Sequence, residues 1–106
     1  MAFNAASEVE NGVATITLDG ELDATVAPQF KEAIEAVAVS EPKRLVLQMK
    51  GLSFMASAGL RVLIFAKQKM GEGVDIYVVS PQEAVLGTLE MSGFSKAVFI
   101  TDTVPE

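Results

Sequence analysis

The hydroxyl of Ser57 stands at the predicted start of the most apolar helix in the sequence, a segment that runs from Ala56 to about Met70. Amide groups in a first helical turn have no acceptor within the helix, so a serine oxygen can accept hydrogen bonds from them. The helix dipole also favours negative charge at that end. Ligands of open α/β sheets gather at such helix N-termini. The simplest interpretation of Ser57 is a helix-capping serine, and the alternative is a functional hydroxyl.

The other side chains offer little for catalysis. The sequence has no His and no Cys. It therefore lacks the commonest general base and cannot build a Ser-His-Asp constellation or a thiolate metal site. The phosphate-binding patterns G-x-x-x-x-G-K-[ST] and G-x-G-x-x-G are absent. The carboxylates of Glu21 and Asp23 fall in a solvated polar turn predicted at 19–23. The sequence predicts a binding protein that is not an enzyme and needs no metal or cofactor.

Charge and hydropathy narrow the choice of partner. The formal net charge is −6, and the eight Lys and Arg residues are scattered along the chain. Nucleic-acid binders usually carry a basic patch, so nucleic acid and anionic membrane surfaces are poor candidates for partners, and we expect no nucleic-acid binding. The acidity fits either solubility alone or a basic protein partner.

No apolar run reaches the roughly 18–20 residues that cross a bilayer, and the N-terminus is not a secretory signal. We expect a cytoplasmic protein without membrane insertion.

A single domain over residues 1–106 accounts for the length. Asn11-Gly12 between two strand-like runs is a strong hairpin signal, because both turn positions need positive φ. Ser80-Pro81 followed by Glu83 has the pattern of a helix start with a serine cap. The residue patterns predict an α/β fold, a mixed sheet with helices packed on it, in the order β-β-α-β-α-β-α-β. Strands are expected at 2–8, 13–18, 45–49, 74–79 and 97–100. Helices are expected at 25–38, at 56–70 and from the Ser80 start to near 91, followed by a loose tail at 101–106.

The helix predicted at 56–70 has more apolar residues than one face needs. Gly59, Val62, Leu63, Ala66 and Met70 share one arc. Three further apolar residues fit neither the core side nor the polar side well: Leu60, Ile64 and Phe65. They either widen the core face or form part of a docking surface beside Ser57, because a helix that is apolar all round must be buried by something.

Taken together, four segments resemble the STAS domain family, in particular the bacterial anti-sigma factor antagonists. The resemblance covers about residues 3–100 in the right order and spacing. The segments that carry it are Leu18-Asp19-Gly20-Glu21-Leu22-Asp23, Leu52-Ser53-Phe54-Met55, Ser57-Ala58-Gly59-Leu60 and Met91-Ser92-Gly93-Phe94.

The resemblance implies a partner and a switch. In this family an unphosphorylated antagonist binds an anti-sigma factor that is also a serine kinase, which frees the sigma factor. Phosphorylation of the first serine in an Asp-Ser-Ser-Gly-Leu motif breaks that complex. The aligned serine here is Ser57, whereas Ala56 and Ala58 replace the aspartate and the second serine. A phosphatase acting on phosphorylated Ser57 is a further implied partner. The two alanines favour the alternative of a STAS module that serves a transporter or signalling complex without phosphorylation.

We therefore expect a partner-binding surface around the start of the second helix, on a protein that is a monomer or a weak dimer. The residues predicted for it are Glu21, Asp23, Met55, Ala56, Ser57, Ala58, Gly59, Leu60, Arg61 and Ile64.

Overall fold

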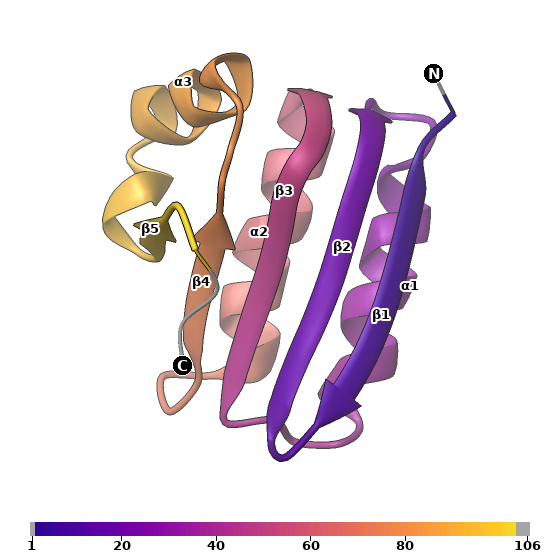
Figure 1. The fold of residues 1–106 in the computed structure, drawn as a ribbon, viewed down its shortest axis with the longest axis vertical. Coiled ribbons are helices and arrows are strands. Elements are labelled where there is room, and N and C mark those ends of the chain that lie inside the picture. Colours follow the sequence, from indigo (N-terminus) through magenta and orange to yellow (C-terminus); the bar gives the residue numbers. More distant parts are fainter. Residues whose placement is uncertain (1, 104–106) are drawn as a thin grey trace.

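A computed structural model describes residues 2–103 of the chain. Its centre is a five-stranded sheet in the order β1-β2-β3-β4-β5, in which β1 pairs antiparallel with β2 and the other neighbours are parallel (Figure 1). The predicted element order is confirmed. The strands are β1 (Asn4–Glu10), β2 (Val13–Leu22), β3 (Arg44–Met55), β4 (Asp75–Val79) and β5 (Phe99–Thr101), and the helices are α1 (Ala27–Ala38), α2 (Ser57–Met70), α3 (Glu83–Ser92) and the short 3₁₀ helix η1 (Phe94–Lys96).

Helices α1 and α2 lie side by side on one face of the sheet (Figure 1). Burial along β2 follows this arrangement, because side chains of a strand alternate between the two faces. Ala14, Ile16 and Leu18 are fully buried in the core, whereas Thr15 and Thr17 on the opposite face are half-buried. The fold thus has one helix-covered face that holds most of the core.

Apolar residues at helical spacing are buried on both α1 and α2, and on α2 they belong to the arc that the sequence predicts. On α1, Phe30 and Ile34 are fully buried, and Pro28 lies in the first turn, where its missing amide hydrogen costs no helical bond. On α2, Leu63 and Ala66 are buried in the same core. The apolar arc predicted for the second helix is therefore confirmed on its buried side.

The opening hairpin is also confirmed. Glu10 pairs with Val13 across a two-residue turn, and Asn11 and Gly12 have φ values of 53° and 80°. Both values lie in the left-handed region that a tight hairpin turn requires.

Two strands run further than the sequence predicted. Strand β2 continues to Leu22, so most of the expected polar turn at 19–23 is strand, and β3 continues from the expected end at 49 to Met55. The extra length comes from two register shifts between the strands, which let β3 carry additional residues opposite β2. Around them, Asp19 pairs with Gly51, and its carboxylate lies against the glycine where no side chain fits. Alternation alone does not reveal such irregular pairing.

The predicted serine cap of α3 is wrong. Helix α3 begins at Glu83 after Gln82, and no side chain caps it. Ser80 instead has a φ of 52°, and its hydroxyl donates to the carbonyl oxygen of Asp102 at 2.8 Å. The serine therefore ties the end of β4 to the segment after β5.

Gly71 ends α2 with a φ of 84° and a ψ of 176°, a positive φ outside the left-handed helical region. One smaller expectation also needs correction. Thr101 belongs to β5 and not to a loose tail. The remaining tail residues, 104–106, lie outside the described part of the chain. Within residues 2–103, no helix is both long and apolar enough to cross a membrane.

Candidate functional site

The candidate site lies where β2 and β3 end and α1 and α2 begin, at one edge of the sheet (Figure 1). The amide of Ala56 donates a hydrogen bond of 2.8 Å to the carbonyl oxygen of Leu22. This bond joins the end of one strand to the residue that precedes α2. Ser57, the first residue of α2, is exposed at this edge.

Gly59 allows α2 to start this close to the sheet. A Cβ atom at Gly59 would lie 2.7 Å from Cγ of Leu22 and 3.1 Å from Cγ of Met55. Both leucine and methionine are buried, so neither has free space to move into. The glycine in the Ser57-Ala58-Gly59-Leu60 segment is therefore a packing requirement that fixes where the Ser57 hydroxyl is presented.

Ser57 does not cap α2, which corrects the simplest sequence interpretation. The N-cap is Ala56, in an extended conformation with φ −80° and ψ 168°, and no side chain caps this helix. The amides of Gly59 and Leu60 donate to the carbonyl oxygen of Ala56 at 3.0 and 3.2 Å. The first turn also contains no acidic residue. Ser57 therefore presents an exposed hydroxyl at the N-terminus of α2 and has no capping role.

Asp23 organises the connection between β2 and α1. Its Oδ1 accepts hydrogen bonds from the hydroxyl of Thr25 at 2.5 Å, from the Thr25 amide at 2.9 Å and from the Val26 amide at 3.3 Å. The Thr25 hydroxyl is the main cause that holds the pKa of Asp23 below its ordinary value. Desolvation opposes this shift, and the amides of Thr25 and Val26 add to the lowering. The carboxylate thus orders the turn that borders the site.

Glu21 and Phe54 pair near the ends of β2 and β3, one residue before the final pair of Leu22 with Met55. Glu21 is exposed, and the Phe54 ring is 45% exposed although it is large and apolar. Next to this pair, the Ser53 hydroxyl donates to the carbonyl oxygen of Gly20 at 3.1 Å and links the two strand ends at the bulge. Gly20 has a φ of 91°, and a Cβ there would collide with the carbonyl oxygen of Ala2.

Sequence reasoning left Phe54 out of the predicted surface. The signal that could have identified it is a large apolar residue between a polar neighbour, Ser53, and a core residue, Met55, at the end of a strand. Because β3 was expected to end at residue 49, no face could be assigned to Phe54.

Of the three surplus apolar residues of α2, two widen the core face and one is exposed to solvent. Leu60 and Phe65 are half-buried and pack against the core, and the Lys31 ammonium lies 4.8 Å from the centre of the Phe65 ring. Ile64 is 42% exposed on the outer side of the helix, next to the exposed Arg61. Ile64 is therefore the apolar residue of this helix that a partner can reach.

Most of the ten predicted partner-binding residues lie at the ends of β2 and β3 and in the first turns of α2, whereas Ile64 lies two turns beyond Ser57, and their surroundings differ. Glu21, Ser57, Arg61 and Ile64 are exposed. Asp23, Ala56, Ala58 and Leu60 are half-buried. Met55 and Gly59 are buried, so their contribution is to support the surface from below. In the described part of the chain, no three Asp or Glu side chains gather in a way that could hold a metal ion.

Comparison with known proteins places this arrangement in a family. The STAS domain pattern matches residues 4–106. The chain belongs to the STAS domain family. The expected resemblance is thereby confirmed, and the STAS fold agrees with the five-strand mixed sheet described above.

Relatives of similar length include anti-sigma factor antagonists. The anti-sigma-F factor antagonist RsfB of Mycobacterium tuberculosis is 30% identical over 94 residues, which are 89% of this chain and 77% of RsfB. The anti-sigma F factor antagonist of Paenibacillus polymyxa is 31% identical over 97 residues, 90% of this chain and 83% of the relative.

Solved STAS structures agree with the fold. An anti-sigma factor antagonist from Mycobacterium paratuberculosis superposes with a TM-score of 0.89 at 27% identity, over 97% of this chain and 88% of the other. The Bacillus SpoIIAA in its phosphorylated form superposes with a TM-score of 0.69 at 20% identity, over 93% of this chain and 90% of the other. At that identity the second likeness concerns the fold alone.

Proposed function

We propose that this STAS domain is an anti-sigma factor antagonist that binds an anti-sigma factor with serine-kinase activity, and that phosphorylation of Ser57 ends the binding. The relatives named above support the kind of partner. The observation that carries the proposal is the exposed Ser57 hydroxyl, which caps nothing and stands at the head of a helix.

The surface offered to the partner combines apolar anchors with a modifiable hydroxyl. Ile64 is a large apolar side chain that remains 42% exposed on α2, two turns beyond Ser57, and Phe54 is 45% exposed at the end of the strand that leads to α2. Glu21 and Arg61 supply charges of both signs around them. Buried aromatic and aliphatic anchors ringed by polar groups are the usual source of affinity in protein interfaces.

A phosphate on Ser57 would act on the complex and leave the domain folded. It adds about 1.5–2 negative charges. At the N-terminus of α2 this charge meets free amide groups and the positive end of the helix dipole. Pressed against an apolar or acidic partner surface without a counter-charge, it would cost several kcal/mol. Each 1.4 kcal/mol, roughly, weakens binding tenfold, so one phosphate is enough to release the partner.

The same proposal covers the setting in which the switch works. The kinase adds the phosphate, a phosphatase removes it, and the antagonist acts as a monomer or weak dimer in the cytoplasm. The binding energy lies in the surface around Ser57, so no catalytic group, metal or cofactor is needed from this chain.

The test compares partner capture by wild-type protein, Ser57→Ala and Ser57→Asp. We expect the alanine variant to hold the anti-sigma factor and the aspartate variant to lose it. Ser7→Asp is a matched control, because Ser7 is exposed on β1 and receives the same added charge. Incubation with the cognate kinase and ATP should place one phosphate on Ser57, as read by mass spectrometry. Phosphate on another residue, or unchanged binding of Ser57→Asp, would contradict the proposal.

One observation favours a second function. Ala56 and Ala58 flank Ser57 in place of the polar residues of the family motif, and the N-cap is an alanine. A STAS module that binds a transporter or signalling protein without phosphorylation would need neither polar residue. Genes for a sigma factor and a kinase beside this gene would support the first function, and transporter genes the second.

A further inference from the structure

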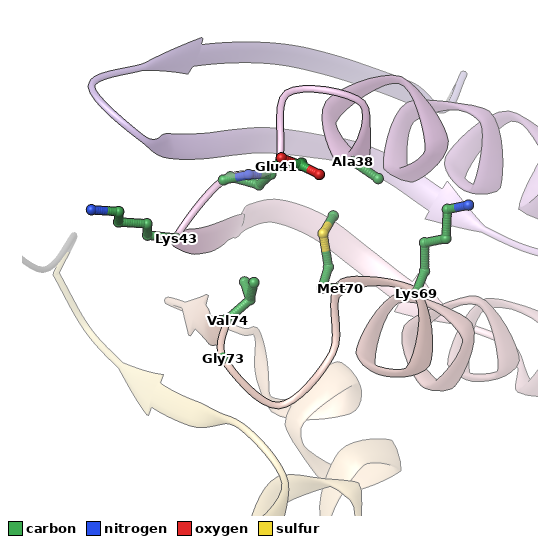
Figure 2. A pocket seen from close by; sticks show the side chains of 8 residues that line it. Ala38, Glu41, Lys43, Lys69, Met70, Gly73 and Val74 are labelled. Atoms are coloured by element: carbon green, nitrogen blue, oxygen red, sulfur yellow. The ribbon is translucent and has the colours of Figure 1, made fainter.

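A cavity of about 410 Å³ opens at the opposite end of α2 from Ser57. It lies between two connections, the one that joins α1 to β3 and the one that joins α2 to β4 (Figure 2). Ligand pockets for small molecules typically have volumes of about 300–1,000 Å³, so the space suits one small organic molecule. None of the residues that line it belongs to the surface proposed for the partner protein.

The walls of the cavity combine apolar and polar surface, and Met70 and Val74 supply much of the apolar part. Met70 and Val74 project from one connection toward Ala38 and Glu41 of the other (Figure 2). Met70 and Val74 are half-buried and pack at the margin of the core, so they form a floor that is in place before any ligand binds. A methionine thioether adapts well to apolar surfaces of different shape.

Charged groups stand at the rim of this apolar floor. Lys43 and Lys69 lie on opposite sides of the cavity, with their ammonium groups outside it, and Glu41 is the acidic residue of the lining (Figure 2). Lysine stems are long and flexible, so either ammonium group can follow a ligand while its stem covers apolar surface. Lys67 and Lys69 also oppose the partial negative charge at the C-terminus of α2. Two lysines against one glutamate favour an anion over a cation.

We propose that this cavity binds a small organic anion with an apolar body. The apolar body lies against Met70 and Val74, and the acidic group pairs with Lys43 or Lys69. The site is independent of the proposed partner switch, because it is built from the far end of α2 and from neither Ser57 nor its neighbours.

Gly73 gives a direct way to close the cavity. It lines the space, and a Cβ atom built on it has no heavy atom within 4 Å. Its φ lies outside the positive range, so a side chain there is not strained by the backbone. Gly73→Leu should therefore add a bulky side chain to the cavity lining without disturbing the fold. Gly87→Leu is the matched control, because Gly87 on α3 has equally open surroundings and lies outside the cavity.

The probe is 8-anilinonaphthalene-1-sulfonate, with decanoate as its competitor. We expect fluorescence titration to give binding that Gly73→Leu weakens by at least about tenfold and that Gly87→Leu leaves unchanged. The double variant Lys43→Gln/Lys69→Gln should weaken binding about two- to fivefold, the range expected for exposed ion pairs, whereas Lys96→Gln should have no effect. Decanoate should displace the probe from wild-type protein.

An NMR titration of the wild-type protein tests the proposal even if a variant fails to fold. Amide shifts of wild-type protein titrated with decanoate should change in residues 38–43 and 69–74 of the NMR spectrum. Shift changes confined to the Ser57 edge or to the exposed Phe99 would overturn the proposal. So would equal probe affinity of wild type and a folded Gly73→Leu variant.

Discussion

The hydroxyl of Ser57 differs from an ordinary helix cap because it makes no hydrogen bond to the backbone amides of the first turn. A capping oxygen is committed to backbone amides, whereas the N-cap position of α2 belongs to Ala56 and its side chain makes no such bond. The helix is positioned instead by the Ala56 amide on Leu22 and by the close contact at Gly59. Stability and the reactive group are therefore carried by different residues, which leaves Ser57 available for modification.

Replacing Ser57 by alanine should hardly change stability. Loss of a true serine cap costs about 1 kcal/mol. Because no cap is present, we expect Ser57→Ala to change the free energy of unfolding by less than about 0.5 kcal/mol, as for an ordinary surface substitution. Urea denaturation of the two proteins checks this, and a loss near the value of a cap would show that the hydroxyl does bond to the first turn.

Asp23 gives a prediction about acid stability. Its pKa is held below the ordinary value of 3.8, mainly by the Thr25 hydroxyl. The stabilisation by its charged form is therefore fully present above that ordinary value and is lost as the pH falls through the lower pKa of the folded state. We expect Asp23→Ala to be less stable than wild type near neutral pH, with a difference that shrinks at acid pH. Thermal unfolding measured at several pH values tests this. A difference that grew toward acid pH would contradict it.

At the scale of elements, much of the fold could be predicted because periodicity reports burial. Phe30 and Ile34 on α1, and Leu63 and Ala66 on α2, follow helical spacing and are all buried. The bulges of β3 could not be predicted, because they depend on pairing with β2, which a single segment does not encode. The Ser80 hydroxyl likewise found its acceptor at Asp102, a residue distant in sequence.

The candidate site was predictable in part, for a similar reason. The motif around Ser57 predicted the start of α2, and the structure places most of the ten residues there or at the strand ends before it, while their role in partner binding stays a prediction. Phe54 was missed because its strand was expected to end earlier, and the burial of Met55 depends on how closely α2 packs on the strand ends. Motifs locate a surface, whereas packing decides which of its side chains a partner can touch.

The close packing of α2 on the sheet can be tested at Gly59. A Cβ atom there would lie 2.7 Å from Leu22, so we expect Gly59→Ala to destabilise the protein by about 1–3 kcal/mol through overpacking. Gly87→Ala is the control: it has open space on α3 and should stabilise by up to about 1 kcal/mol through helix propensity. Urea denaturation measures both. Equal effects of the two substitutions would show that α2 is not seated as described.

The outer side of α2 carries the prediction for partner binding. Ile64→Asp should weaken binding of the anti-sigma factor by about tenfold or more, because a charge replaces an apolar anchor. Since Ile64 is 42% exposed, unfolding should change little. Val39→Asp is a suitable control, because Val39 is 85% exposed at the opposite end of α1. Titration calorimetry gives the affinities for the anti-sigma factor. If both variants lose the same affinity, α2 is not part of the interface.

At the scale of the whole molecule, the proposed switch changes charge and leaves shape alone. The phosphate adds about 1.5–2 negative charges to a chain whose net charge is already −6. The added charge stands at the N-terminus of α2, where the dipole stabilises it. Nothing in the core has to move for it to be accommodated, since Ser57 is exposed.

We therefore expect phosphorylated and unphosphorylated protein to have the same far-UV circular dichroism spectrum and closely similar melting temperatures. Their affinities for the anti-sigma factor should nonetheless differ strongly. A phosphorylated protein that loses helix signal or melts much earlier would indicate release by unfolding and not by local charge.

The contact between Gly20 and the carbonyl oxygen of Ala2 has a practical consequence for handling the protein. It brings the first residues of the chain to the edge of the sheet where Phe54 and Ser57 are presented. A purification tag on the N-terminus would start beside that edge and compete with a binding partner for space. A tag placed after β5 would leave from the opposite margin of the sheet, so C-terminal fusions are the better choice for capture assays.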